Sequence, residues 1–295
     1  MLREAAILVL ILAVPGCKQE GSSPSLAVAS TGTADGAAAV VTAKNGKVQV
    51  LRAADGSVAE AKVGDRLSVR DALRTDIGEA DVAVEGVRVR VHEGSRLELK
   101  QVGQKNLRAR VRGSVESEVE QKGKLDVEIE NSDALAHSEG GHFFVTADGR
   151  GVVAVASVTG TVNVSGGGKS IELAKGEVTR MTKRDPKPSV PVAALRRVLL
   201  NVQWPNQKET NKPTFPIAGR VEPGSRVFVQ GEPVQVEEGG TFRTEVPLRQ
   251  GKQKIAVVTV DALGRRKQVE SVVLRDDSLP NIKVKKRLWQ WRWRS

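Results

Sequence analysis

The chain has 295 residues, 39% of them apolar, and a formal net charge of +11. This length allows two or three small domains. A single Cys excludes an internal disulfide framework and a Cys-rich zinc site, and three His leave little room for a multi-histidine metal centre.

The first 17 residues carry the features of a bacterial lipoprotein signal peptide. Residues 5–14 form an uninterrupted apolar run, which has the length of a secretory h-region and is too short to span a bilayer. The run ends in Val14-Pro15-Gly16-Cys17, which resembles a lipobox. The resemblance implies cleavage before Cys17 and acylation of this residue, which anchors the mature chain in a membrane. The alternative is a buried N-terminal helix with a chance cysteine.

Residues 18–44 have the composition of a flexible linker. They are rich in Gly, Ala, Ser and Thr and show no apolar stripe of helical spacing. Lys18 follows the candidate lipidation site, whereas in enteric bacteria an Asp at this position retains lipoproteins in the inner membrane. We therefore expect a lipid-anchored protein of the bacterial cell envelope, on the periplasmic or surface face of the outer membrane.

Residues 45–183 alternate apolar and polar side chains with a period of two. Val48 and Val50 alternate with polar residues, and the same alternation recurs over residues 87–91 and 125–129. Frequent glycines interrupt these runs. This pattern is typical of short antiparallel strands with one buried and one wet face.

An internal repeat supports this interpretation and carries a family resemblance. The pattern Gly-x-Val-x-Val begins at Gly46 and again at Gly160, and each copy is followed by a Gly-acidic pair, Gly64-Asp65 and Gly176-Glu177. With the later Val and Leu pairs, residues 45–183 resemble a FecR domain, which implies a β-domain of hairpins or solenoid-like coils. The founding members relay receptor occupancy to a sigma factor and carry a cytoplasmic segment and a transmembrane helix, a plan that this sequence does not follow. The resemblance thus implies an extracytoplasmic β-domain that binds or senses.

A second β-domain is predicted after a Pro-rich boundary. Residues 184–203 contain this boundary, with a short helix expected over 191–202. Residues 204–278 then show strand and turn signals every 8–12 residues, including Pro223-Gly224 and Gly240-x-Phe242. This segment is similar to bacterial Ig-like domains and predicts a β-sandwich. The expected fold class is therefore all-β.

The candidates for catalysis or metal binding are few. His137, Glu139 and His142 form the best local cluster, but on an extended strand the first two share a face that His142 does not. We interpret the cluster as a polar strand edge. The segment Gly166–Ser170 resembles the end of a phosphate-binding loop without its first glycine, and we interpret it as a hairpin turn. We expect no catalytic residues, no metal site, no cofactor and no enzymatic activity.

Residues 279–295 form a basic, Trp-rich tail. It carries six positive charges and no negative ones, and three Trp lie at alternate positions. Lys and Arg attract anionic surfaces and Trp favours the headgroup region of a membrane. The candidate anion-binding residues are Lys283, Lys285, Lys286, Arg287, Trp289, Trp291, Arg292, Trp293 and Arg294. Two alternatives are a final strand whose Trp face packs on the preceding domain and, less favoured for an exported protein, nucleic-acid binding.

Together these features predict a non-catalytic lipoprotein of the cell envelope that binds or scaffolds. The expected partners are a membrane, through the lipid anchor, and an envelope protein, a glycan or an anionic polymer such as lipopolysaccharide. The alternative is a sensor of FecR type that relays a signal to a separate membrane partner. We expect no nucleic-acid ligand.

Overall fold

The computed structural model describes residues 38–148, 151–206 and 208–278, and all regular structure in them is β-strand. The predicted all-β class is confirmed. No helix in these ranges has the length and apolar character needed to cross a bilayer.

The helix expected over residues 191–202 is wrong. Two short strands lie there instead, β15 (Val192–Ala193) and β16 (Leu200–Gln203), and they pair with strands on either side of the segment. Val192 and Leu195 are exposed, so the segment buries no continuous apolar stripe. An isolated helix of this length without a packed face is marginal in water, whereas the strands gain backbone hydrogen bonds from their neighbours.

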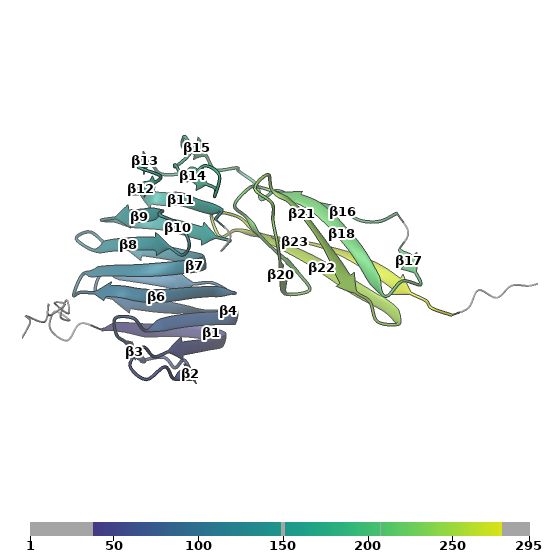
Figure 1. Ribbon diagram of the computed structural model, residues 1–295, viewed down its shortest axis with the longest axis horizontal. Helices are drawn as coiled ribbons and strands as arrows, with labels where there is room; N and C mark the ends of the chain where they lie inside the picture. The colour runs from purple at the N-terminus through teal and green to yellow at the C-terminus, as the bar shows by residue number, and fades with distance from the viewer. Residues whose placement is uncertain (1–37, 149–150, 207, 279–295) are drawn as a thin grey trace, which may run out of the picture. The chain divides into compact units, whose positions relative to one another are not determined.

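The first fifteen strands form one sheet (Figure 1). They are β1 (Ala39–Leu51), β2 (Val58–Glu60), β3 (Arg66–Leu67), β4 (Ala72–Val84), β5 (Val87–Val91), β6 (Ser95–Val102), β7 (Asn106–Val119), β8 (Lys124–Ile129), β9 (Leu135–Ser138), β10 (Gly141–Ala147), β11 (Val153–Gly160), β12 (Val162–Gly166), β13 (Lys169–Leu173), β14 (Glu177–Met181) and β15.

Two long strands, β4 and β7, fold this sheet into two layers. The first half of β7 pairs with β6 and β8, whereas its second half pairs with β5 and β10. In the same way β4 pairs with β6 through residues 72–75 and with β5 through residues 80–84. Each of these strands therefore belongs to both layers, and the first fifteen strands form a sandwich made from one continuous sheet.

Glycines allow the long strands to turn from one layer to the other. Gly46 of β1 lies opposite Gly78 of β4, with φ angles of 75° and 136°. A Cβ on Gly78 would lie 2.0 Å from the carbonyl oxygen of Asn45, and a Cβ on Gly46 would lie 2.2 Å from that of Ile77. Only glycine accepts both this backbone conformation and this close approach.

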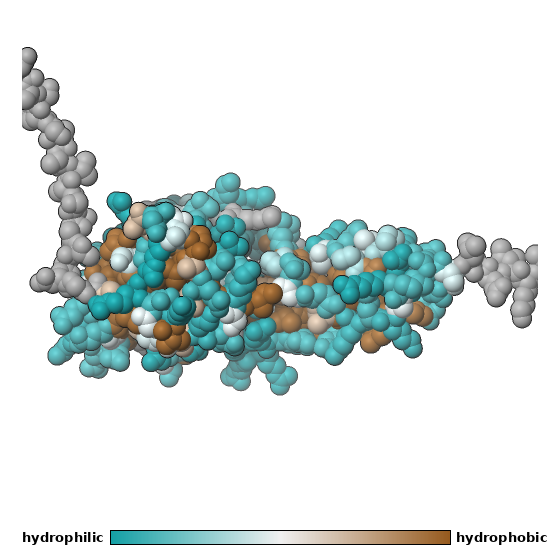
Figure 2. Space-filling model, turned by 90° about the horizontal axis from the view of Figure 1, so that it is seen from below, coloured by the Kyte–Doolittle hydropathy of each residue, from teal (hydrophilic) through white to brown (hydrophobic). Residues whose placement is uncertain are grey.

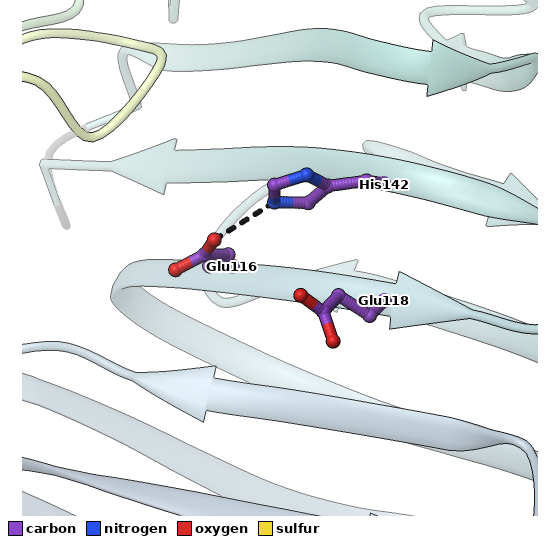
Figure 3. Close-up of side chains that lie close together, drawn as sticks. All are labelled: Glu116, Glu118 and His142. Atoms are coloured by element: carbon purple, nitrogen blue, oxygen red, sulfur yellow. Dashed lines mark hydrogen bonds and ion pairs between the residues drawn. The ribbon is translucent and has the colours of Figure 1, made fainter.

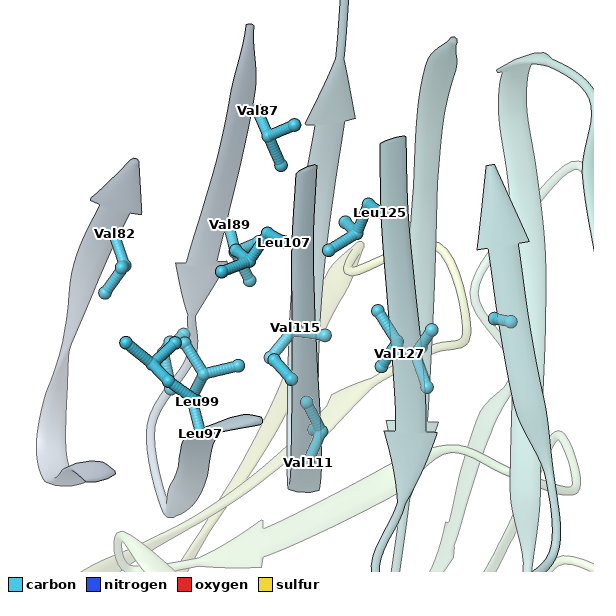
Figure 4. Close-up of a cluster of buried hydrophobic side chains, with 14 of the residues drawn as sticks. Val82, Val87, Val89, Leu97, Leu99, Leu107, Val111, Val115, Leu125 and Val127 are labelled. Carbon is cyan, nitrogen blue, oxygen red and sulfur yellow. The ribbon is translucent and has the colours of Figure 1, made fainter. Parts of the chain in front are cut away.

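The two layers enclose one core of mainly aliphatic side chains (Figure 4). Val89 and Val115 come from one layer, and Leu97, Leu99 and Val127 come from the other; all five are fully buried. The alternating residues of each strand point outward, as the period of two predicts. The valines and leucines of the predicted pattern therefore form the interior.

Eight further strands form a second β-sandwich. One sheet has the order β16-β18-β21 and the other β17-β23-β22-β19-β20, with β17 parallel to β23. The additional strands are β17 (Glu209–Thr210), β18 (Thr214–Val221), β19 (Arg226–Val229), β20 (Glu232–Val234), β21 (Thr241–Pro247), β22 (Gly251–Val260) and β23 (Arg266–Arg275). Apart from β17, this is the strand order of immunoglobulin-like sandwiches. Phe215, Ile217 and Phe242 lie in its core.

A third, smaller apolar cluster contains residues from both sandwiches. Ala154, Ala156 and Val178 project from the outer face of β11 and β14 and pack with Ala262. Arg180 forms an ion pair with Glu222, and its Nε donates a hydrogen bond to the backbone carbonyl oxygen of Pro223 at 2.7 Å. The small alanine side chains permit close approach to this part of the sheet.

Elsewhere the surface is mainly hydrophilic, with hydrophobic residues interspersed on the face shown in Figure 2. The larger exposed apolar side chains include Val58, Val63 and Ile77. Scattered exposed residues of this kind are normal for a folded protein.

We predict that Gly78→Ala lowers the free energy of unfolding by about 2–5 kcal/mol, because backbone strain and overpacking add. Gly56→Ala is the matched control: Gly56 also has positive φ, but no atom lies within 4 Å of its added Cβ. The control is expected to lose only about 1–2 kcal/mol. Chemical denaturation followed by circular dichroism measures both, and equal losses would contradict the role of the close glycine pair.

Candidate functional site

Ionisable side chains gather on the outer face of the layer that contains β4, β5, β7 and β10. Val87, Val89 and Val91 of β5 point into the core, so Arg88, Arg90 and His92 point outward. On β7 buried residues alternate in the same way with Glu116 and Glu118, which also point outward. We call this set the β7 charge cluster; its members are Asp81, Arg88, Arg90, His92, Glu116, Glu118 and His142.

The strand register places these residues in rows across the sheet. In one row Asp81 lies opposite Arg90, which lies opposite Glu116. In the adjacent row Arg88 lies opposite Glu118, which lies opposite His142. Directly opposed side chains of unlike charge attract each other across strands, so the register itself brings the cluster together.

Arg90 binds two carboxylates. Its guanidinium makes a two-pronged contact with Asp81, from Nε to Oδ1 at 2.8 Å and from Nη2 to Oδ2 at 3.2 Å, and Nη1 lies 3.6 Å from Glu116 Oε2. The hydrogen bonds to Asp81 raise the pKa of Arg90 further above its usual range. Arg90 therefore stays positively charged; its hydrogen bonds fix the orientation of Asp81, and its charge attracts Glu116.

Glu116 lies at the centre of the cluster. Its Oε1 is 2.8 Å from His142 Nε2, and its Oε2 is 3.7 Å from His92 Nε2. The Glu116 side chain is 17% exposed, whereas Glu118 is 52% exposed and pairs with Arg88 at 3.2 Å. One carboxylate is thus held between two imidazoles, and a second, more exposed one lies beside it.

Glu116, Glu118 and His142 lie close enough to share a ligand (Figure 3). One donor atom from each residue lies within 4.8 Å of the other two. Figure 3 shows His142 reaching from β10 toward the two glutamates of β7. Chemically the three residues offer one imidazole nitrogen and two carboxylate oxygens.

His92 is largely buried, between the ring of Phe144 and the carboxylates of Glu79 and Glu116. Its ring stacks on Phe144 with the ring centroids 6.2 Å apart and the planes inclined by 13°. Burial lowers the pKa of His92, although Glu116 and Glu79 act in the opposite direction. Its Nε2 is buried and has no hydrogen-bond partner among the described residues.

The metal candidate considered from the sequence does not assemble. His137 binds Asp126 through Nδ1 at 2.7 Å and approaches Glu139 through Nε2 at 3.7 Å, whereas His142 binds Glu116. The partners of His142 come from a strand more than twenty residues earlier in the chain. Only the register of β7 against β10 joins them. The alternation of Glu116 and Glu118 with buried residues is a sequence signal that could have placed both on one outer face.

Two further predictions concern the turn at Gly166–Ser170 and the residues near the two ends of the chain. Gly166 and Lys169 face each other where β12 turns into β13, as the predicted hairpin turn requires. Cys17 and all nine residues of the predicted anion-binding tail lie outside the described residues.

Comparison with known proteins gives partial structural similarity. No protein-family model and no curated protein matches this chain. Two crystal structures described as "a putative anti-sigma factor from Parabacteroides distasonis ATCC 8503" align with 41% of this chain at 16% identity and a TM-score of 0.37. The alignment spans 59% of that protein. A solved structure of a polysaccharide lyase aligns with 83% of this chain at 11% identity and a TM-score of 0.21. The alignment covers 40% of the lyase chain. Similarities at these scores assign neither a fold nor a function.

We predict that His92 makes stability depend on pH. Its pKa in the folded chain lies below the ordinary value of 6.5, so the unfolded chain binds the proton more tightly. The contribution of neutral His92 is complete above pH 6.5 and is lost as the pH falls through the folded pKa. Denaturation of the parent and of His92→Gln between pH 5 and 8 is expected to show a steeper decline for the parent. Parallel curves would contradict the prediction.

Proposed function

We propose that this protein is a non-catalytic, lipid-anchored binding module of the bacterial cell envelope. The observation that carries the proposal is where the charges lie. In the sandwich of β1–β15 the interior is aliphatic, and the members of the β7 charge cluster pair with one another on an outer sheet face. A rigid sheet that presents fixed charges suits recognition of a polar partner.

The proposed anchor is Cys17. The Val14-Pro15-Gly16-Cys17 sequence follows an apolar run and precedes a Gly-, Ala- and Ser-rich linker. A lipid at Cys17 and a flexible linker would hold the β-sandwiches near a membrane but free of it. The outer membrane is the favoured location, because Lys18 rather than Asp follows the anchor.

The proposed ligands are an envelope protein, a glycan or an anionic polymer. The tail of residues 279–295 supports the last of these, since it combines six positive charges with three alternating Trp. Cations of this kind bind phosphate-bearing surfaces, and Trp rings enter the headgroup region.

A second candidate is a FecR-type sensor that relays a signal to a separate membrane partner. It is supported by the sequence resemblance of residues 45–183. The residues that carry the resemblance, among them Val48, Leu67 and Leu97, belong to a single core. Cross-linking in envelope fractions separates the two candidates: an inner-membrane signalling protein favours the sensor, and a glycan or structural protein favours the scaffold.

We predict that Cys17→Ser moves the protein out of the membrane fraction. Without the thiol no acyl chain can be attached, and the apolar contribution of the lipid to membrane binding is lost. Fractionation of bacteria grown with a labelled fatty acid measures both effects. Lys18→Ala serves as a control that keeps the thiol. Label incorporation that survives Cys17→Ser would contradict the proposed anchor.

We predict that deletion of residues 283–295 weakens binding to anionic surfaces. The expected loss is at least tenfold on vesicles containing phosphatidylglycerol and on lipopolysaccharide, with little change on zwitterionic vesicles. The parent's binding is expected to fall as salt rises, because ions screen the Lys and Arg charges. Binding that is unaffected by deletion or by salt would contradict a role of the tail.

A further inference from the structure

We propose that His142, Glu116 and Glu118 bind a divalent transition-metal ion of the Zn²⁺ type on the outer face of β7 and β10. This inference is independent of the proposed envelope function, because it rests on the described side chains of one sheet layer.

The donor set fits such an ion. Zn²⁺ is bound by imidazole nitrogen and carboxylate oxygen, whereas Mg²⁺ and Ca²⁺ prefer oxygen alone. A tetrahedral ion with bonds of about 2.1 Å holds its donors about 3.4 Å apart. The three donor atoms here lie within 4.8 Å of one another, so small side-chain rotations bring them to that spacing.

The sheet holds the three donors in place. His142 and Glu118 lie directly opposite each other on paired strands, and Glu116 is the next outward residue along β7. All three side chains project from hydrogen-bonded strands rather than from loops, and this limits how far the donors can separate (Figure 3).

The surroundings of Glu116 are compatible with a metal-binding carboxylate. The buried Nε2 of His92 has no hydrogen-bond partner among the described residues and lies 3.7 Å from Glu116 Oε2. A metal on the Oε1 side leaves Oε2 to accept a hydrogen bond from His92. Outer contacts of this kind orient metal-binding carboxylates and histidines.

The neighbouring arginines compete only weakly with a metal. Arg90 is held by its two-pronged contact with Asp81 and stays 3.6 Å from Glu116. Arg88 pairs with Glu118 where both side chains are more than half exposed, and exposed pairs of this kind are weak. With neutral histidines the β7 charge cluster keeps one net negative charge, which a cation offsets.

The test is titration of the untagged full chain with Zn²⁺ by calorimetry at pH 7.5, with Cys17→Ser present in every variant so that no thiol competes. The expected result is one bound ion. His142→Gln and Glu116→Gln are each expected to weaken binding at least tenfold. His137→Gln is the matched control, because His137 meets its two carboxylates through different ring nitrogens, so that one ion cannot bridge all three.

Co²⁺ provides a readout of the ligands themselves. A visible absorption band of a four- or five-coordinate ion is expected with the parent and with His137→Gln, and is expected to be lost with His142→Gln. Circular dichroism checks that each variant is folded. If His142→Gln unfolds, Glu118→Gln replaces it, since the Glu118 side chain is more than half exposed.

Equal Zn²⁺ affinity in the parent and the folded variants would overturn the site. Loss of binding in His137→Gln to the same extent as in His142→Gln would overturn it as well, because it would show general association of the ion with surface histidines.

Discussion

The architecture depends on long strands that belong to two layers at once. β4 and β7 each change partners along their length, and β1 pairs with β4 throughout while its other edge passes from β3 to β2. A strand can do so only where its backbone turns sharply without a side chain in the way. The opposed pair of Gly46 and Gly78 meets this condition, and the carbonyl oxygens of adjacent residues lie where a Cβ would be.

The division into two layers also determines which side chains are available to form a binding site. Since the layers face each other across an aliphatic core, alternate residues of every strand must point outward. The charges of β5 and β7 are therefore presented on one outer face, in rows set by the register. Ion pairs on such a face add little stability individually, but the rigid sheet holds them at fixed positions. The same rigidity that the core provides is what a binding site needs.

The β7 charge cluster combines two kinds of environment. Arg88 and Glu118 are more than half exposed, whereas His92 is largely buried against Phe144. Glu116 lies between them and contacts both histidines. Within this cluster, buried and exposed ionisable side chains therefore lie only a few residues apart.

The sequence by itself determined the class of structure and which residues face inward. A period of two with β-branched residues is a local property, and it placed Val48, Val89 and Leu97 inside. Over residues 191–202 a weak helical pattern was misleading, because pairing with other strands outweighed it. The meeting of His142 with Glu116 and Glu118 was decided only by the tertiary structure. Which strands become neighbours, and in which register, depends on contacts between residues far apart in the chain, and alternation within one strand carries no information about them.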